Sequence, residues 1–157
     1  MAMTVLQLTL LIVLGLLLIA AAATDLRARI IPNRLNVAIA LLAIAWWWAE
    51  AATPVEILVR IGLACLVFAL FAGAFALGMM GGGDVKLIGA LALWLPAFKL
   101  LKMLVWMSIA GGMLTVAMLA LHALRRRRGQ PEIPYGVAIA GATLCLLAND
   151  ILTIRTS

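Results

Sequence analysis

The sequence has little charge. Only 11% of its 157 residues are charged, six are acidic, and a single residue is histidine. An ordinary soluble domain carries about 25% charged residues, so this composition excludes that class. One histidine and two separated cysteines also lack the clustering and spacing of a metal site. We therefore expect no metal and no other cofactor.

The few reactive or basic residues have simple interpretations. Cys65 and Cys145 lie inside apolar runs, where we expect two buried, small hydrophobic side chains and no disulfide. His122 lies near the end of another apolar run and is expected to be an interfacial or hydrogen-bonded histidine, not a catalyst. The net charge of +6 gathers at segment ends without interleaved aromatics, which indicates lipid headgroups as partners and excludes nucleic acid.

Long apolar runs make up most of the chain, and 67% of its residues are hydrophobic. Runs of this length predict transmembrane helices, so the expected fold is an all-α, polytopic membrane bundle with about six helices. Residues 1–157 are expected to form one transmembrane domain. The expected segments are Val5–Ala23, Leu35–Ala49, Ile57–Leu77, Val85–Leu95, Leu101–Leu124 and Tyr135–Leu147.

Basic residues predict how the segments are oriented. No Lys or Arg precedes the first run but three arginines follow it, the reverse of a signal peptide, so we expect a retained helix. The positive-inside rule then places residues 25–34, 78–86 and the loop with Arg125–Arg128 in the cytoplasm, and both termini outside. Lys99 and Lys102 contradict the rule. The five tryptophans are expected to form an external aromatic belt: Trp46, Trp47, Trp48, Trp94 and Trp106.

Two acidic residues stand at the ends of apolar segments. Asp25 follows the first segment and Asp84 precedes the fourth, and the predicted orientation puts both on the cytoplasmic side. Acidic residues are costly in a bilayer and usually have a function there. The fourth segment spans about 16 Å, short of the roughly 30 Å hydrocarbon core, which would submerge Asp84. Alternatively, a helix bent at Pro96 would lift Asp84 to the surface.

Three glycines precede Asp84 and a lysine follows it. Gly81, Gly82 and Gly83 lack a Cβ, which permits positive φ and close approach of backbone or substrate. A plain turn with Asp84 as the cap of the next helix explains the same pattern. Lys86 could hold a carboxylate in its ionised form, bind a substrate backbone or act as a cytoplasmic anchor.

These residues carry a family resemblance. Gly81-Gly82-Gly83-Asp84 followed by Lys86 resembles the Gly-x-Gly-Asp-x-Lys signature of prepilin peptidases. Asp25, with Ile31-Pro32-Asn33 downstream, resembles the family's first motif, Asp-x(5)-Ile-Pro-Asn. The resemblance implies an aspartyl endopeptidase of the bacterial inner membrane that removes short basic leaders from prepilins and pseudopilins at the cytoplasmic face.

The resemblance also implies roles for these residues. Asp25 and Asp84 would be catalytic, whereas the three glycines, Lys86, Pro32 and Asn33 would support the site or bind substrate. Two close carboxylates should share one proton, so one can activate water while the other donates a proton. Two alternatives from other classes are a proton- or ion-coupled transporter and a noncatalytic pilus assembly subunit.

The chain departs from the longer members of the family. It has no insertion with Cys-x-x-Cys motifs, so it is similar to the short peptidases of Flp (Tad) pilus systems, and we do not predict methyl transfer. Pro134-Tyr135-Gly136 resembles a stretch before the family's last helix. It either borders the active site or only begins a helix.

The sequence predicts that chelators leave cleavage unchanged, because water activation would depend on carboxylates. Prepilin cleavage by the purified protein should be the same with and without EDTA. Loss of cleavage that one added metal restores would contradict the prediction.

Overall fold

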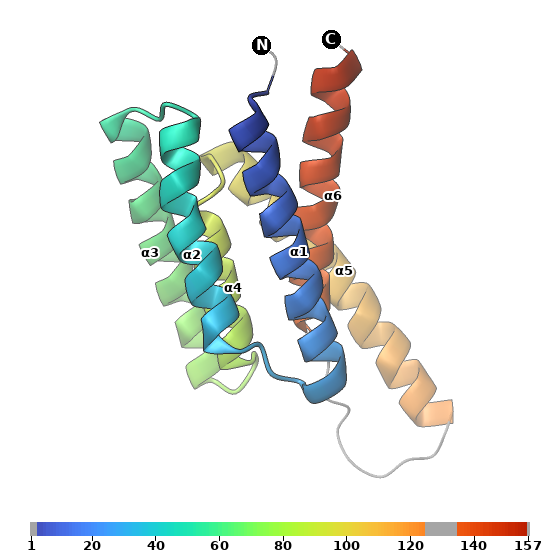
Figure 1. Ribbon diagram of the computed structural model, residues 1–157. Helices are drawn as coiled ribbons and strands as arrows, with labels where there is room; N and C mark the ends of the chain where they lie inside the picture. Colours follow the sequence, from blue (N-terminus) through green and yellow to red (C-terminus); the bar gives the residue numbers. More distant parts are fainter. Residues whose placement is uncertain (1–2, 125–134, 157) are drawn as a thin grey trace.

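The computed structural model describes residues 3–124 and 135–156, and these ranges contain six α-helices and no strand. Successive helices run in opposite directions, which confirms an all-α bundle with six helical segments (Figure 1). We call the end of the bundle where α1 begins and α6 ends the terminal end. The opposite end, where α1 ends and where α4 and α6 begin, is the aspartate end. The helices are α1 (Val5–Ala28), α2 (Asn33–Ala49), α3 (Pro54–Ala76), α4 (Gly82–Ala92), α5 (Ala97–Leu124) and α6 (Tyr135–Thr156).

α1 is longer than its apolar run. Thr4 is the N-cap of α1 and forms a capping box with Gln7. Arg29 is the C-cap: it has a left-handed φ of 56°, and its backbone N–H donates to Asp25 O at 2.9 Å. The expectation that Asp25 begins a loop is therefore wrong. The apolar run ends before Asp25, but the helical backbone hydrogen bonds continue through Ala28. Asp25 therefore lies on the last turn of the helix.

α4 is the central helix of the bundle. Eight of its eleven residues are buried, and it packs against α2, α3 and α6. A helix that is apolar on all sides is stable only when other helices surround it. α4 ends at Ala92, and α5 begins at Ala97 and runs back toward the aspartate end (Figure 1). The alternative of one bent helix continuing past Pro96 is therefore wrong.

Tryptophans fix the far end of α4. Trp94 is buried, stacks on Trp46 with ring centroids 5.6 Å apart, and donates from Nε1 to Ile39 O at 2.8 Å. Trp47 Nε1 donates to Leu93 O at 2.7 Å. The indoles of Trp47 and Trp94 thus bind carbonyl groups inside the bundle, and Trp46 packs on Trp94. The external aromatic belt stays a prediction. Trp48 and Trp106 are exposed.

The outer surface of the helices is largely apolar. Leu16, Leu66 and Val116 are examples of large exposed aliphatic side chains, and surfaces of this kind face lipid. Within the described residues, three helical segments are long and apolar enough to cross a membrane: Val5–Ala28, Pro54–Ala76 and Ala97–Leu121. Cys65 and Cys145 are also exposed, so the expectation that they are buried is wrong. An apolar run in a membrane bundle turns many of its residues outward rather than into the core.

Two ion pairs lie near the terminal end. Lys99 Nζ is 2.6 Å from Asp150 Oδ2, which joins the start of α5 to α6. Arg60 is buried, and its Nη1 lies 2.8 Å from Glu50 Oε2, an ion pair by distance without the angles of a hydrogen bond. Lys102 lies over the ring of Phe98, 4.6 Å from its centroid. The basic residues that contradicted the charge rule thus have local partners.

The arrangement predicts which loops share a side of the membrane. In a background with both native cysteines replaced by alanine, cysteines introduced at Arg29 and Met79 should resist an impermeant maleimide in intact cells and react after lysis. A cysteine at Val55, at the other end of α3, should react in both conditions. Labelling of the Arg29 or Met79 position in intact cells would contradict the predicted orientation.

Candidate functional site

Two buried carboxyl groups meet at the aspartate end. Asp25 is 5% exposed and Asp84 is 7% exposed, so both acidic side chains are buried in an apolar bundle. α1 supplies Asp25 from its last turn and α4 supplies Asp84 from its first turn. The two side chains are close enough for the charge of Asp25 to act on Asp84. The fold thus places the two aspartates expected from the sequence in one site.

The start of α6 holds the Asp25 carboxylate. Its Oδ2 accepts a hydrogen bond from Val137 N–H at 3.2 Å, and the Gly136 N–H also faces it. The first N–H groups of a helix have no partner within the helix and carry partial positive charge, so they stabilise an anion. A Cβ on Gly136 would lie 2.8 Å from Asp25 Oδ2 and 2.7 Å from Ile31 Cδ1. A side chain at position 136 would therefore force Asp25 or the side chain of Ile31 to move.

Asp84 lies in the first turn of its own helix. Gly81 is the N-cap of α4, and the Asp84 carboxyl group turns back to the Gly81 N–H. The alternative that Asp84 is itself the cap is wrong, because the Asp84 N–H already donates to Gly81 O at 3.1 Å. Each aspartate thus accepts hydrogen bonds from the N-terminus of a helix.

The three glycines allow close packing. Gly81 has an ordinary φ of −74°, and Gly82 and Gly83 belong to the helix. Among the described glycines, the positive φ occurs at Gly78, at 73°. The positive φ that glycine permits is therefore not used at positions 81–83. A Cβ on Gly83 would lie 3.3 Å from the backbone N of Ile31, and one on Gly82 would lie 3.2 Å from the Phe75 ring. Close approach of backbone, the second expectation, is confirmed.

The remaining residues of the two motifs lie beside the pair. Pro32 caps α2 without a side-chain hydrogen bond, and Asn33 begins the helix. Lys86 is exposed and donates from Nζ to Asn33 Oδ1 at 2.9 Å. Two residues along a helix face nearly opposite directions, so Lys86 points away from Asp84. Lys86 therefore joins the two motifs, and no ion pair connects it to either aspartate in the described structure.

Sequence reasoning missed Asn36 and Val137. Asn36 is 5% exposed, and its Nδ2 donates to Gly83 O at 3.3 Å, next to Asp84. Its Oδ1 is buried and has no hydrogen-bond partner. A signal for Asn36 existed, because an amide one turn after Asn33 is unusual in an apolar helix. Val137 acts through its backbone and leaves no signal in its side chain.

Some residues singled out in the sequence cannot be placed. Pro134 and Arg125–Arg128 lie outside the described residues, as does the side chain of His122. Within the described part of the chain, no group of three or more His, Cys, Asp or Glu side chains could hold a metal ion.

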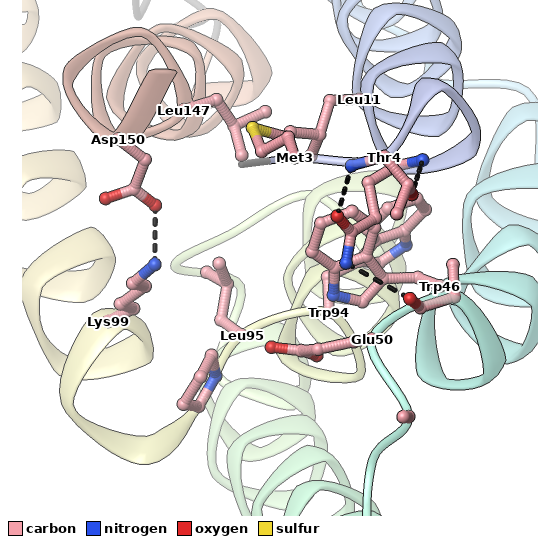
Figure 2. A pocket seen from close by; sticks show the side chains of 14 residues that line it. Met3, Thr4, Leu11, Trp46, Glu50, Trp94, Leu95, Lys99, Leu147 and Asp150 are labelled. Atoms are coloured by element: carbon pink, nitrogen blue, oxygen red, sulfur yellow. Dashed lines mark hydrogen bonds and ion pairs between the residues drawn. The ribbon is translucent and has the colours of Figure 1, made fainter. Parts of the chain in front are cut away.

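A cavity of about 410 Å³ lies at the terminal end, far from the aspartates (Figure 2). Figure 2 shows Lys99 and Asp150 facing each other at its rim, with Trp46 and Trp94 on the other side. These polar groups are already paired and the cavity contains neither Asp25 nor Asp84. Its chemistry gives no reason to prefer it to the aspartate end as the functional site.

Comparisons with known proteins agree with the two motifs. Residues 12–116 match the type IV leader peptidase family. The chain is 30% identical over 148 residues to a prepilin leader peptidase/N-methyltransferase of Xanthomonas campestris pv. campestris. That alignment covers 90% of the chain and 50% of the relative, so the chain spans about half the length of this curated relative. No solved structure matches the chain. Because this family match covers more than half of the chain, the chain belongs to the type IV leader peptidase family.

Proposed function

We propose that this protein is an aspartic endopeptidase that removes the leader from type IV prepilins, with Asp25 and Asp84 as its catalytic pair. The observation that carries the proposal is the convergence of these two buried carboxyl groups, from α1 and α4, at one end of an apolar bundle. Family membership supports this chemistry. A buried pair of acids supplies both functions that hydrolysis of a peptide bond requires, a general base and a general acid.

The hydrogen bonds around the pair support different roles for the two acids. Burial disfavours the charged form of both acids, but Asp25 faces two N–H groups, of Gly136 and Val137 at the start of α6, whereas Asp84 faces one, of Gly81. Asp84 lies close to the charge of Asp25, and two neighbouring carboxylates do not both ionise readily. We therefore assign Asp25 as the resting carboxylate and Asp84 as the resting acid.

These roles give a balanced reaction. Asp25 accepts a proton from water as the water oxygen bonds to the scissile carbonyl carbon, and Asp84 donates its proton to the carbonyl oxygen. The resulting gem-diol returns one hydroxyl proton to Asp84 as the C–N bond breaks, and Asp25 gives its proton to the leaving amine. The products are a carboxylic acid and an amine, and each aspartate regains its starting state.

We infer the substrate and the orientation of the protein from the sequence resemblance and from its apolar surface. The apolar outer faces of the helices support a position in the inner membrane, and the proposed aspartate end faces the cytoplasm, where leaders of Flp-type prepilins would be available. Residues 1–157 would act as one catalytic domain, in which Lys86 and Asn33 contact substrate and Pro32 and the three glycines support the backbone. Methyl transfer is not proposed, although the name of the Xanthomonas relative includes it.

Asp25→Asn and Asp84→Asn should each reduce prepilin cleavage to background, because an amide cannot exchange a proton as a carboxyl group does. Membrane insertion and yield should stay close to those of the wild type, since the side-chain volume hardly changes. Cleavage is measured by gel shift and amino-terminal sequencing of the product. Asp150→Asn is the matched control at the terminal end and should cleave normally. Wild-type cleavage by either of the first two variants would exclude the pair and favour a noncatalytic role.

Gly136→Ala should reduce kcat by about a hundredfold, the size of effect that misplacing a reacting group by about 1 Å produces. The added Cβ would displace Asp25 or Ile31, because it would lie less than 3 Å from both. Gly141→Ala, on the same helix, is the matched control, since a Cβ there meets nothing within 4 Å. Equal activity of the two variants would contradict the role of α6 in positioning Asp25.

A further inference from the structure

The first turn of α6 packs on a glycine of α5. Tyr135 is the first residue of α6, and a Cβ on Gly111 of α5 would lie 3.2 Å from both Cδ1 and Cε1 of its ring. The same Cβ would lie 3.9 Å from the Cβ of Ala138. Residues 135 and 138 are three apart and share one face of the helix. Gly111 is therefore the place on α5 where the first turn of α6 rests.

Two hydroxyl groups extend this contact. Thr115, one turn after Gly111 on α5, donates from Oγ1 to Gly111 O at 2.7 Å, and its Oγ1 lies 3.3 Å from the hydroxyl of Tyr135. A threonine hydroxyl carries a single proton, so once Thr115 donates it to Gly111, the Tyr135 hydroxyl is the donor to Thr115. The Tyr135 side chain is thus held both at its ring and at its hydroxyl.

The next two residues of the same turn face Asp25. Val137 N–H donates to Asp25 Oδ2 at 3.2 Å, and the Gly136 N–H also faces this carboxyl group. Both donors follow Tyr135 directly along the backbone. The first turn of α6 therefore touches Asp25 of α1 and Gly111 of α5, so a shift of Tyr135 on α5 would also shift the two N–H groups on Asp25.

We propose that Tyr135 is a positioning residue for the catalytic pair: packed on Gly111 and hydrogen-bonded to Thr115, it fixes the first turn of α6 on Asp25. This inference rests on the proposed peptidase function. In the described structure Tyr135 makes no hydrogen bond to either aspartate, so it acts through the backbone of α6. Tyr135 and Gly136 thus both begin the last helix and border the site, which joins the two interpretations of this stretch.

The kinetic test adds one methyl group to the contact. Gly111→Ala should lower kcat for prepilin about tenfold and leave KM within about twofold, because the ring would move by part of an ångström and Asp25 would act on water, not on substrate binding. Gly112→Ala is the matched control, since a Cβ there meets nothing within 4 Å. Equal kcat in the two variants, or a rise in KM without a fall in kcat, would overturn the proposal.

Substitutions of Tyr135 separate its ring from its hydroxyl. Tyr135→Phe keeps the ring on Gly111 and should retain more than about a third of the wild-type kcat, because one hydrogen bond is lost. Tyr135→Ala should lower kcat about tenfold or more. In the Tyr135→Ala background, Gly111→Ala should change kcat by less than about twofold, since the ring that it would displace is absent. A further tenfold fall in that background would show that Gly111 acts by another route and would overturn the proposal.

Hydrogen exchange separates failure of this inference from failure of the proposed function, because it needs no cleavage. Mass spectrometry of the purified protein should show exchange in a peptide covering residues 135–140 at least about threefold faster in Gly111→Ala than in Gly112→Ala, as the hydrogen bond from Val137 to Asp25 weakens. Neither substitution changes that peptide. Equal exchange would overturn the positioning role even in an active peptidase. Faster exchange in Gly111→Ala, with no prepilin cleavage by the wild type, would support the contact and overturn the peptidase function.

Discussion

Two carboxyl groups inside an apolar bundle need hydrogen-bond donors, and helix N-termini supply them. Asp84 faces the Gly81 N–H at the start of its own helix, and Asp25 faces Gly136 and Val137 at the start of α6. These N–H groups would otherwise have no partner, so each helix start and each acid satisfies the other. The arrangement fixes where α1, α4 and α6 meet, and the rest of the bundle accommodates that junction.

Close packing around the junction explains why glycine occupies positions 83 and 136 better than conformational freedom of the backbone does. Gly83 and Gly136 both stand against Ile31, which follows the end of α1. A side chain at either position would push the α1–α2 connection away from α4 or α6. The same short connection carries Pro32 and Asn33, so the two sequence motifs meet through backbone contacts as well as through the Lys86–Asn33 hydrogen bond. The motifs therefore describe one packed corner of the protein.

The two ends of the bundle have different functions in the fold. At the terminal end, the indoles of Trp47 and Trp94 bind carbonyl groups, and Lys99 pairs with Asp150. The two indole contacts fix the end of the short helix α4. At the aspartate end, Asn36 retains a free acceptor beside the Gly83 carbonyl.

The sequence by itself determined the membrane class, the six helical segments and the two aspartates, because apolar runs and rare acids are local features of the chain. It did not determine that α1 continues past Asp25, that Lys86 points to Asn33, or that Trp47 and Trp94 bind carbonyl groups inside the bundle. Hydropathy cannot distinguish a lipid-facing position from a core position either, so Cys65 was expected to be buried and is exposed. Only the tertiary structure decided these points. The donors to Asp25 are backbone N–H groups from a distant helix, which every residue but proline carries, so no side chain in the sequence marks them.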